Sequence, residues 1–114
     1  MIEIIREKIS QAILESHLGQ PYDSMIKFVV DLHRQVMVLG GQLHADGEAL
    51  LLRDGSSQSD LWGGNYFPKR SGDEQVEYTS MINIRPSARN FSTEVKDEVV
   101  RKRMLEIVRN LLPC

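Results

Sequence analysis

The residue types best suited to chemistry gather in a glycine-rich stretch, residues 40–65, with the sequence GGQLHADGEALLLRDGSSQSDLWGGN. Within it His44, Asp46 and Glu48 occupy alternate positions, so on an extended segment all three side chains would share one face. One imidazole and two carboxylates on a common face could supply nitrogen and oxygen ligands to a divalent metal. Such a centre would suit a small metal-dependent hydrolase or nuclease.

A structural interpretation competes for the same residues. The segment EALLLR consists of strong helix formers, Asp46 is placed to cap the first turn, and Gly55 is placed to end the helix. On the short helix that this predicts, about 47–54, the three side chains would fan apart. Neither His17 nor His33 completes a metal-binding spacing. The sequence therefore predicts no cofactor and leaves metal binding by the three residues open.

Other catalytic signatures are missing from the sequence. No G-x-S-x-G motif surrounds a serine, and the glycines of the stretch lack the spacing and the Lys-Ser/Thr ending of a phosphate-binding loop. Cys114, the single cysteine, stands at the last position, where we expect a frayed thiol rather than a nucleophile. These patterns leave open whether the protein is an enzyme.

Length and composition limit the remaining classes. With 114 residues, 26% of them charged and 41% hydrophobic, the chain is expected to fold as a single domain over residues 1–114. A net charge of -2 and a pI near 5.9 give no general attraction to phosphate backbones, so nucleic-acid binding is not expected. A lone cysteine fits a reducing, cytoplasmic compartment. No stretch approaches the roughly 20 apolar residues of a membrane span.

Hydrophobic periodicity and turn residues divide the chain into strands and helices. Strands are predicted at 2–5, 26–32, 36–41, 61–67 and 76–85, although the first of these also fits the opening turn of a helix. The second and third strands should form one hairpin and the last two another. The glycine pair at 63–64 suits either a bulge or a close approach of another group to the backbone.

Two more helices complete the prediction. Ser10 is placed as the N-cap of a helix over 11–18, and Asp97 caps a C-terminal helix. In the C-terminal helix apolar residues recur at helical spacing and form a stripe that must pack on the sheet: Val100, Met104, Ile107, Val108 and Leu111. We predict an α+β fold with an antiparallel sheet of four or five strands, a long C-terminal helix and one or two shorter helices packed on one face.

Alternation along the strands indicates which side chains face away from these helices. If Val30 points toward them, Asp31 points away, and the same rule sends Asn83 and Arg85 outward from the last strand. Arg85 precedes a proline, which holds its backbone extended, and its forked guanidinium could grip a carboxylate or phosphate at two points. The alternative is a structural ion pair of Arg85 with Asp31 or Glu77.

Two strings of the sequence are long enough to be compared with a known family: FVVDLHRQVMVLGGQLHADGEALLLRDGSSQSDLWGGN and INIRPSARNFS. Together they resemble a family of small uncharacterised proteins of cyanobacteria and other bacteria, catalogued only as a domain of unknown function, over nearly the whole chain. The resemblance implies no activity. The family pattern has an acid where this chain has His33 and a Glu where it has Gln42, which puts a role for acids at those places in doubt. The resemblance directs interest to the residues that match its motifs: His44, Asp46, Glu48, Asp54, Gln58, Asp60, Trp62, Asn65, Asn83 and Arg85.

We therefore predict a cytoplasmic binding or regulatory module that forms a homodimer through an open sheet edge or an apolar face. Its recognition surface should combine the glycine-rich stretch with the end of the last strand: His44, Asp46, Glu48, Asp60, Trp62, Asn65, Asn83 and Arg85. Arg85 would then lie within about 8 Å of an acid or imidazole of this set. The alternatives are the metal-dependent hydrolase or nuclease and an RNA adaptor that uses basic residues of the C-terminal third.

Overall fold

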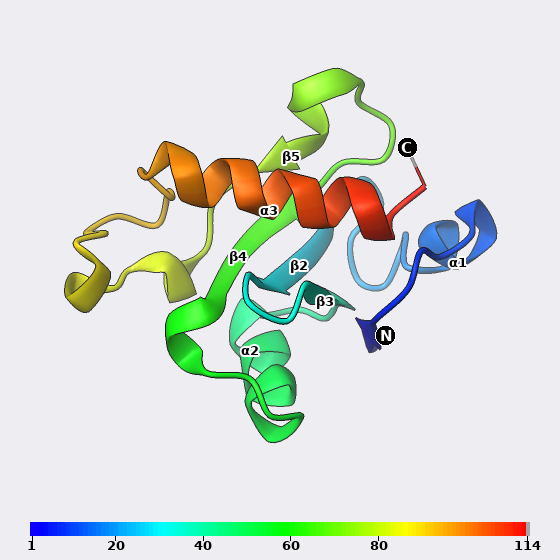
Figure 1. The fold of residues 1–114 in the computed structure, drawn as a ribbon. Helices are drawn as coiled ribbons and strands as arrows, with labels where there is room; N and C mark the ends of the chain where they lie inside the picture. The colour runs from blue at the N-terminus through cyan, green and yellow to red at the C-terminus, as the bar shows by residue number, and fades with distance from the viewer. Residues whose placement is uncertain (114) are drawn as a thin grey trace.

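The computed structural model describes residues 1–113, and Cys114, with its expected frayed thiol, lies outside the described residues. Five antiparallel strands form one sheet in the order β1-β3-β2-β4-β5 (Figure 1). The strands are β1 (Ile2–Ile5), β2 (Ile26–Asp31), β3 (Val36–Gly40), β4 (Leu61–Tyr66) and β5 (Val76–Glu77), and the helices are α1 (Gln11–Ser16), α2 (His44–Arg53) and α3 (Glu98–Leu111). The predicted α+β fold class is confirmed. None of the helices in residues 1–113 has the length and apolar character needed to cross a membrane.

The central strand β2 contributes to two hydrophobic clusters on opposite faces of the sheet. Phe28 and Val30 lie in a large cluster with α3, whereas Val29 lies in a smaller cluster with Leu51 of α2. Figure 1 shows α3 lying across the front of the sheet. We expected all helices on one face, but α2 instead covers the second face. Its apolar side chains bury the alternate residues of β2 and β3 that point away from α3.

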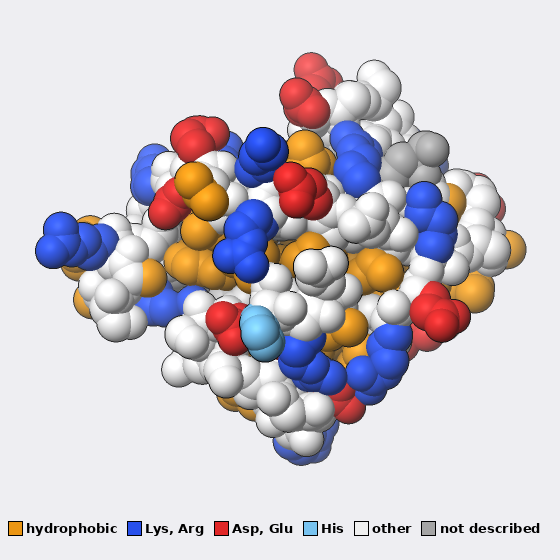
Figure 2. Space-filling model, viewed as in Figure 1, with side chains coloured by type: hydrophobic (Ala, Val, Ile, Leu, Met, Phe, Trp, Pro, Cys, Tyr) orange, Lys and Arg blue, Asp and Glu red, His pale blue; other side chains and the backbone are white. Residues whose placement is uncertain are grey.

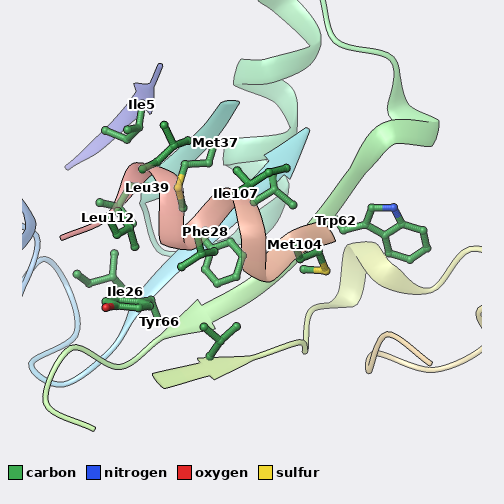
Figure 3. Close-up of a cluster of buried hydrophobic side chains, with 14 of the residues drawn as sticks. Ile5, Ile26, Phe28, Met37, Leu39, Trp62, Tyr66, Met104, Ile107 and Leu112 are labelled. Carbon is green, nitrogen blue, oxygen red and sulfur yellow. The ribbon is translucent and has the colours of Figure 1, made fainter. Parts of the chain in front are cut away.

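The C-terminal helix α3 packs as its apolar stripe predicts. Four residues of the stripe are buried: Met104, Ile107, Val108 and Leu111. Figure 3 shows Met104 and Ile107 in the same cluster as Phe28. The N-cap is also confirmed, because Asp97 Oδ1 accepts a hydrogen bond from Val99 N at 2.8 Å. Each fully buried side chain of this kind contributes roughly 1.5–3 kcal/mol.

Asp31 holds the hairpin that joins β2 to β3. Its Oδ1 accepts hydrogen bonds from the backbone N–H groups of His33 and Arg34, both at 2.9 Å. Its Oδ2 accepts a hydrogen bond from Ser56 Oγ at 2.6 Å, which ties the hairpin to the end of α2. Asp31 is fully buried, and within residues 1–113 it forms no ion pair with Arg85. The predicted pairing of these two residues is therefore wrong.

The segment 76–85 departs most from its prediction. We expected one long strand, but only Val76 and Glu77 pair with β4, and a 3-10 turn follows at Met81–Asn83. Ser80 begins that turn, because its Oγ accepts a hydrogen bond from Ile82 N at 3.2 Å. The alternation that indicated a strand thus runs into a turn that a serine cap imposes.

The helix α2 begins earlier than predicted. It starts at His44 rather than near residue 47, with Leu43 at the N-cap position and no side-chain cap. Asp46 is therefore not the cap, and its own N–H donates to Leu43 O at 3.1 Å. Gly55 follows the helix with φ 108°, which agrees with its predicted role at the helix end.

The elements β1, α1 and β4 follow their predicted patterns more closely. β1 is a strand and not a helical turn, and Ser10 Oγ accepts a hydrogen bond from Ile13 N at 3.2 Å as the N-cap of α1. α1 ends at Ser16, slightly before its predicted end. β4 pairs with β2 in regular register through Gly63 and Gly64, without a bulge. Of the two interpretations of the glycine pair, the one that remains is a close approach of another group to the β4 backbone.

Charged side chains of both signs cover the α3 side of the molecule. Figure 2 shows basic and acidic groups interspersed there, with hydrophobic atoms visible between them. Arg101 pairs with Glu94, and Arg103 donates to Leu32 O at 3.0 Å. These basic side chains are therefore used within the fold and do not form a patch of one sign.

Candidate functional site

A cavity of about 340 Å³ lies beside the first turn of α2. We call it the α2 pocket, and its lining residues are Lys27, Leu43, His44, Ala45, Asn65, Thr79, Ser80, Met81, Ile82 and Thr93. They come from β2, β4, the start of α2 and the segment around the 3-10 turn. Two predicted site residues, His44 and Asn65, are thereby brought together. Much of the wall is hydrocarbon, so the few polar groups in it are the ones that could recognise a ligand.

His44 is buried at the start of α2, and one hydrogen bond fixes its ring. Nε2 lies 2.7 Å from Gly64 O, and a carbonyl can only accept, so Nε2 carries the proton. Burial lowers the pKa of His44 below its ordinary value of 6.5. The Lys27 charge lowers that pKa further, whereas Gly64 and the Asn65 side chain act in the opposite sense. The neutral ring therefore has its single N–H engaged.

Asn65 reaches the same pocket from β4 and is only 8% exposed. As a member of the predicted recognition surface Asn65 was expected to be exposed, but it forms part of this buried wall. Its Nδ2 donates to Glu77 Oε1 at 3.4 Å, whereas its Oδ1 accepts no hydrogen bond from residues 1–113. Among the causes of the pKa shift of His44, the Asn65 side chain has the smallest effect. The neutral His44 ring gives its one N–H to Gly64 O. Oδ1 is thus a buried acceptor for which a bound molecule could provide the donor.

Gly63 allows the 3-10 turn and α2 to approach β4 closely. A methyl group on Gly63 would lie 2.7 Å from Ser80 Cβ, 2.8 Å from Ser80 Oγ and 3.1 Å from His44 Cδ2. The first two distances are too short for non-bonded atoms, so a side chain at this position requires movement. Gly63 therefore makes the close approach that the glycine pair suggested.

Replacing Gly63 by alanine should destabilise the protein by about 1–3 kcal/mol, because Ser80 or β4 must move. Urea unfolding followed by circular dichroism measures this loss. In a Ser80→Gly background the same replacement should cost much less, because the atoms that the methyl group meets first are absent. Equal costs in the two backgrounds would show that Ser80 does not set the constraint.

The neutral state of His44 leads to a prediction about pH. Because its pKa is lower in the folded chain than its ordinary value of 6.5, the unfolded chain binds more protons between these two pKa values. The stability that His44 contributes is complete above the ordinary pKa and is lost as the pH falls through the lowered one. The free energy of unfolding should therefore decrease from about pH 7.5 to about pH 5, and should decrease less in His44→Gln.

Asp54 provides a comparison in a different pH range. Hydrogen bonds from Arg6 and Arg34 lower the pKa of Asp54 from 3.8 to about 2, so its contribution is lost only in strongly acid solution. The pH range in which Asp54 titrates therefore does not overlap with the range assigned to His44. Urea titrations at about pH 7.5 and about pH 5 measure the free energy of unfolding of the wild type and of His44→Gln. If both proteins lose the same free energy between these pH values, the assignment to His44 is contradicted.

Arg85 packs beside the start of β4, next to another predicted site residue, Trp62. Its guanidinium carbon lies 4.4 Å from the centroid of the Trp62 ring, and its Nη2 donates to Leu61 O at 2.5 Å. Burial lowers the pKa of Arg85, while the charges of Glu48 and Asp60 act to raise it. Within the described chain it forms no direct ion pair with an acid. Two acids of the predicted set therefore act on Arg85 through their charge and without direct contact.

The group around Arg85 does not line the α2 pocket. Trp62 is 5% exposed and belongs to the cluster packed by α3, at whose margin Figure 3 places it. The pocket and this group are linked through Ile82, which lines the pocket and whose carbonyl accepts from Arg85 Nη2 at 3.4 Å. Glu77, the other proposed partner of Arg85, pairs with Arg70 at 3.7 Å. The eight predicted residues thus fall into neighbouring groups, of which the pocket holds His44 and Asn65.

Asn83 is completely buried and points inward, contrary to the expectation from alternation. Its Oδ1 accepts from Gly63 N at 2.8 Å, and its Nδ2 donates to Gly63 O at 2.9 Å and to Thr93 O at 3.1 Å. These bonds satisfy backbone groups of β4 beyond the point where β5 ends. A second buried amide, Asn90, donates to Asn83 O at 2.8 Å. Asn83 therefore positions the segment that forms one wall of the pocket.

The metal ligands considered at the start of the glycine-rich stretch do not come together. On the helix α2, His44 is buried and hydrogen-bonded to Gly64 O, and Asp46 is exposed. The charge of Glu48 acts on Arg85 in the direction that raises its pKa. Residues 1–113 contain no group of three or more His, Cys, Asp or Glu side chains that could hold a metal ion. The hydrolase alternative therefore has no ligand set at this place.

Sequence reasoning missed most of the pocket wall. Lys27 carried a usable signal, because alternation with Phe28 placed it on the face opposite α3. Met81 and Ile82 carried none, since their segment has the alternating pattern of a strand. The turn that it forms instead depends on a serine cap together with tertiary hydrogen bonds. Leu43 was missed because the start of α2 was placed too late.

The fold and the pocket define an α+β domain whose five-stranded antiparallel sheet is covered on both faces and which holds a ligand-sized cavity beside α2. The chain belongs to the family described as Protein of unknown function (DUF5674), whose model matches residues 3–111. The resemblance to a family of unknown function is thereby confirmed. Searches of curated proteins and of solved structures found no match to this chain. The function must therefore be inferred from the site.

Proposed function

We propose that this protein is a cytoplasmic binding module whose α2 pocket takes a small molecule. The observation that carries the proposal is a concave, mostly hydrocarbon wall that includes the buried side chain of Asn65, whose Oδ1 has no hydrogen-bond partner among residues 1–113. Its volume of about 340 Å³ falls in the range of ligand sites, roughly 300–1,000 Å³. The lone cysteine supports the cytoplasmic compartment.

The rim of the pocket supports the proposal energetically. Leu43 and Met81 are 61% and 74% exposed, although both side chains are large and apolar. A ligand that covers part of them gains roughly 25 cal/mol for each Å² of apolar surface removed from water. The unbranched side chain of Met81 can also adapt to the shape of what it contacts.

Binding is favoured over catalysis because the candidate catalytic groups are engaged in the fold. His44 Nε2 is bonded to Gly64 O, and Ser80 Oγ accepts a hydrogen bond from Ile82 N. No hydrogen bond joins His44 to Ser80 in the described part of the chain. A nucleophile and its base would need such a bond.

A chemical-shift titration of nitrogen-15-labelled protein tests the proposal with four probes: hexan-1-ol, hexane-1,2-diol, hexanoate and 2-hydroxyhexanoate. At least one of them should shift the amide signals of the pocket residues Leu43, His44, Met81 and Ile82 in a saturable manner. Ala45→Trp should abolish these shifts, because Ala45 lines the pocket from an exposed position. Ala49→Trp is the matched control, since Ala49 is also exposed on α2 but does not line the pocket.

The titration has outcomes that count against the proposal. If no probe shifts the pocket amides, or if Ala45→Trp binds as well as Ala49→Trp, the cavity is not a binding site. A thermal melt of both variants shows whether each one is folded before its binding is compared.

The homodimer remains part of the proposed function, with β1 as the contact strand. β1 is at one edge of the sheet, and Ile2 on it is 38% exposed. A strand at a sheet edge presents unpaired backbone groups, which can pair with a second copy of the chain. Ile2→Lys should therefore weaken association. Sedimentation equilibrium measures it, and a single 13.0 kDa species for the wild type at high concentration would refute the dimer.

A further inference from the structure

We infer that the ligand of the α2 pocket is a small carboxylate that carries a hydrogen-bond donor beside the carboxylate and an apolar chain, as a 2-hydroxy acid does. This inference rests on the proposed function and adds the chemical class of the ligand. Asn65, the Lys27 side of the pocket and the hydrocarbon rim specify the three parts in turn.

Asn65 specifies the donor. Its Nδ2 faces Glu77 Oε1 at 3.4 Å, so exchanging the two ends of the amide would set its oxygen against a carboxylate. The atom without a partner among residues 1–113 is therefore Oδ1. It is covered in this structure, so an O–H or N–H of the ligand reaches it when the Asn65 side chain turns toward the pocket. His44 does not supply it while neutral, because its one N–H is bonded to Gly64 O. The negative charge of Glu77 beside Asn65 is offset by Arg70, whose Nη1 lies 3.7 Å from Glu77 Oε2.

Lys27 and the start of α2 specify a negative charge. Lys27 stands opposite Asn65 in the pairing of β2 with β4 and lines the same pocket. Among residues 1–113 its ammonium group pairs with no acid, and it lies 5.5 Å from the centroid of the Tyr22 ring. Leu43 leaves the positive end of α2 without a side-chain cap at the pocket. Asp46 in the first turn is exposed and does not line the wall.

The hydrocarbon rim specifies the apolar chain. Leu43 and Met81 are exposed at the pocket, and Ala45 and Ile82 continue the same wall. An alkyl chain that leaves the carboxylate end would lie against these side chains and remove them from water. A fatty acid lacks the donor for Asn65, a diol lacks the charge for Lys27, and only their combination satisfies the whole pocket.

The affinities of the four probes for the wild type test the inference. 2-Hydroxyhexanoate should bind roughly threefold to tenfold more tightly than hexanoate, because its hydroxyl group donates to Asn65 Oδ1. It should also bind more tightly than hexane-1,2-diol, and this advantage should shrink at high salt, which screens the attraction to Lys27. Dissociation constants come from the shifts of the pocket amides.

Two variants separate the roles of the polar groups. Asn65→Leu keeps the size of the side chain and should remove the advantage of the hydroxyl group while the advantage of the carboxylate remains. Lys27→Met keeps the aliphatic stem and should do the opposite. A variant that merely loosened the fold would weaken all four probes to the same extent.

The outcomes distinguish this inference from the proposed function. If the diol, hexanoate and 2-hydroxyhexanoate bind equally well, the pocket binds small molecules but the ligand class is wrong. If no probe shifts the pocket amides, both proposals fail. If Asn65→Leu retains the hydroxyl advantage, Asn65 is not the acceptor, and if that variant does not fold, the ranking of probes on the wild type decides.

Discussion

Replacing Asn83 by leucine should remove about 3–5 kcal/mol of stability, a large part of the roughly 5–15 kcal/mol that holds a domain folded. The leucine side chain has a similar size, so the loss comes from hydrogen bonding. Asn83 pairs with both the N–H and the C=O of Gly63, at 2.8 Å and 2.9 Å, where β5 no longer reaches β4. Gly63 pairs with β2 on one side of β4 but has no strand neighbour on the β5 side, where the Asn83 amide takes that place. Leucine would leave these buried groups unpaired.

Urea unfolding monitored by circular dichroism measures this effect. Asn110→Leu is the matched control, because Asn110 is exposed on α3 and the same replacement there should change stability by less than about 0.5 kcal/mol. The amide hydrogen of Gly63 should also exchange faster in Asn83→Ala than in the wild type. A stability of Asn83→Leu within about 1 kcal/mol of wild type would show that these bonds contribute little.

Ile107→Asp should unfold the domain. Ile107 is 4% exposed in the middle of α3, within the cluster that this helix forms with the sheet (Figure 3). The change removes a buried apolar side chain and places an unpaired carboxylate in the core, and each effect costs several kcal/mol. Together they approach or exceed the total stability of a domain of this size.

A circular dichroism melt checks this prediction. Asn110→Asp introduces the same residue at an exposed position of α3 and should cost less than about 1 kcal/mol, which includes the unfavourable charge near the helix C-terminus. If the melt of Ile107→Asp overlays that of the wild type, α3 is not a core element.

Local patterns predicted those parts of the fold that local chemistry controls. The stripe of α3, the caps at Ser10 and Asp97 and the β2–β3 hairpin all depend on residues close together in sequence, and all were confirmed. The segment after β5 could not be predicted in this way. Its turn begins at a local serine cap, but Asn83 holds it against β4 through Gly63 and Thr93, which are 20 and 10 residues away in sequence. The alternating pattern was overruled by these hydrogen bonds together.

Only part of the candidate site was predicted, because the rest of it also depends on tertiary contacts. His44 and Asn65 stood out by residue type, but their meeting in one pocket depends on where α2 begins and on which face it covers. Leu43 and Met81 are ordinary apolar residues whose exposure at a pocket becomes visible only in three dimensions. Asp46 illustrates the opposite case, a residue singled out by spacing that the helix turns toward solvent.

The order of the strands also implies an order of folding events. β2 and β3 are joined by the short turn at residues 32–35, so their pairing closes a small loop at little entropic cost. β4 joins β2 only after the chain has passed through α2, and the turn at Met81–Asn83 can dock only on a completed β4. We expect the hairpin to be formed in the folding transition state and the Asn83 bonds to form after it. Changes at Asp31 would then slow folding, whereas changes at Asn83 would chiefly accelerate unfolding.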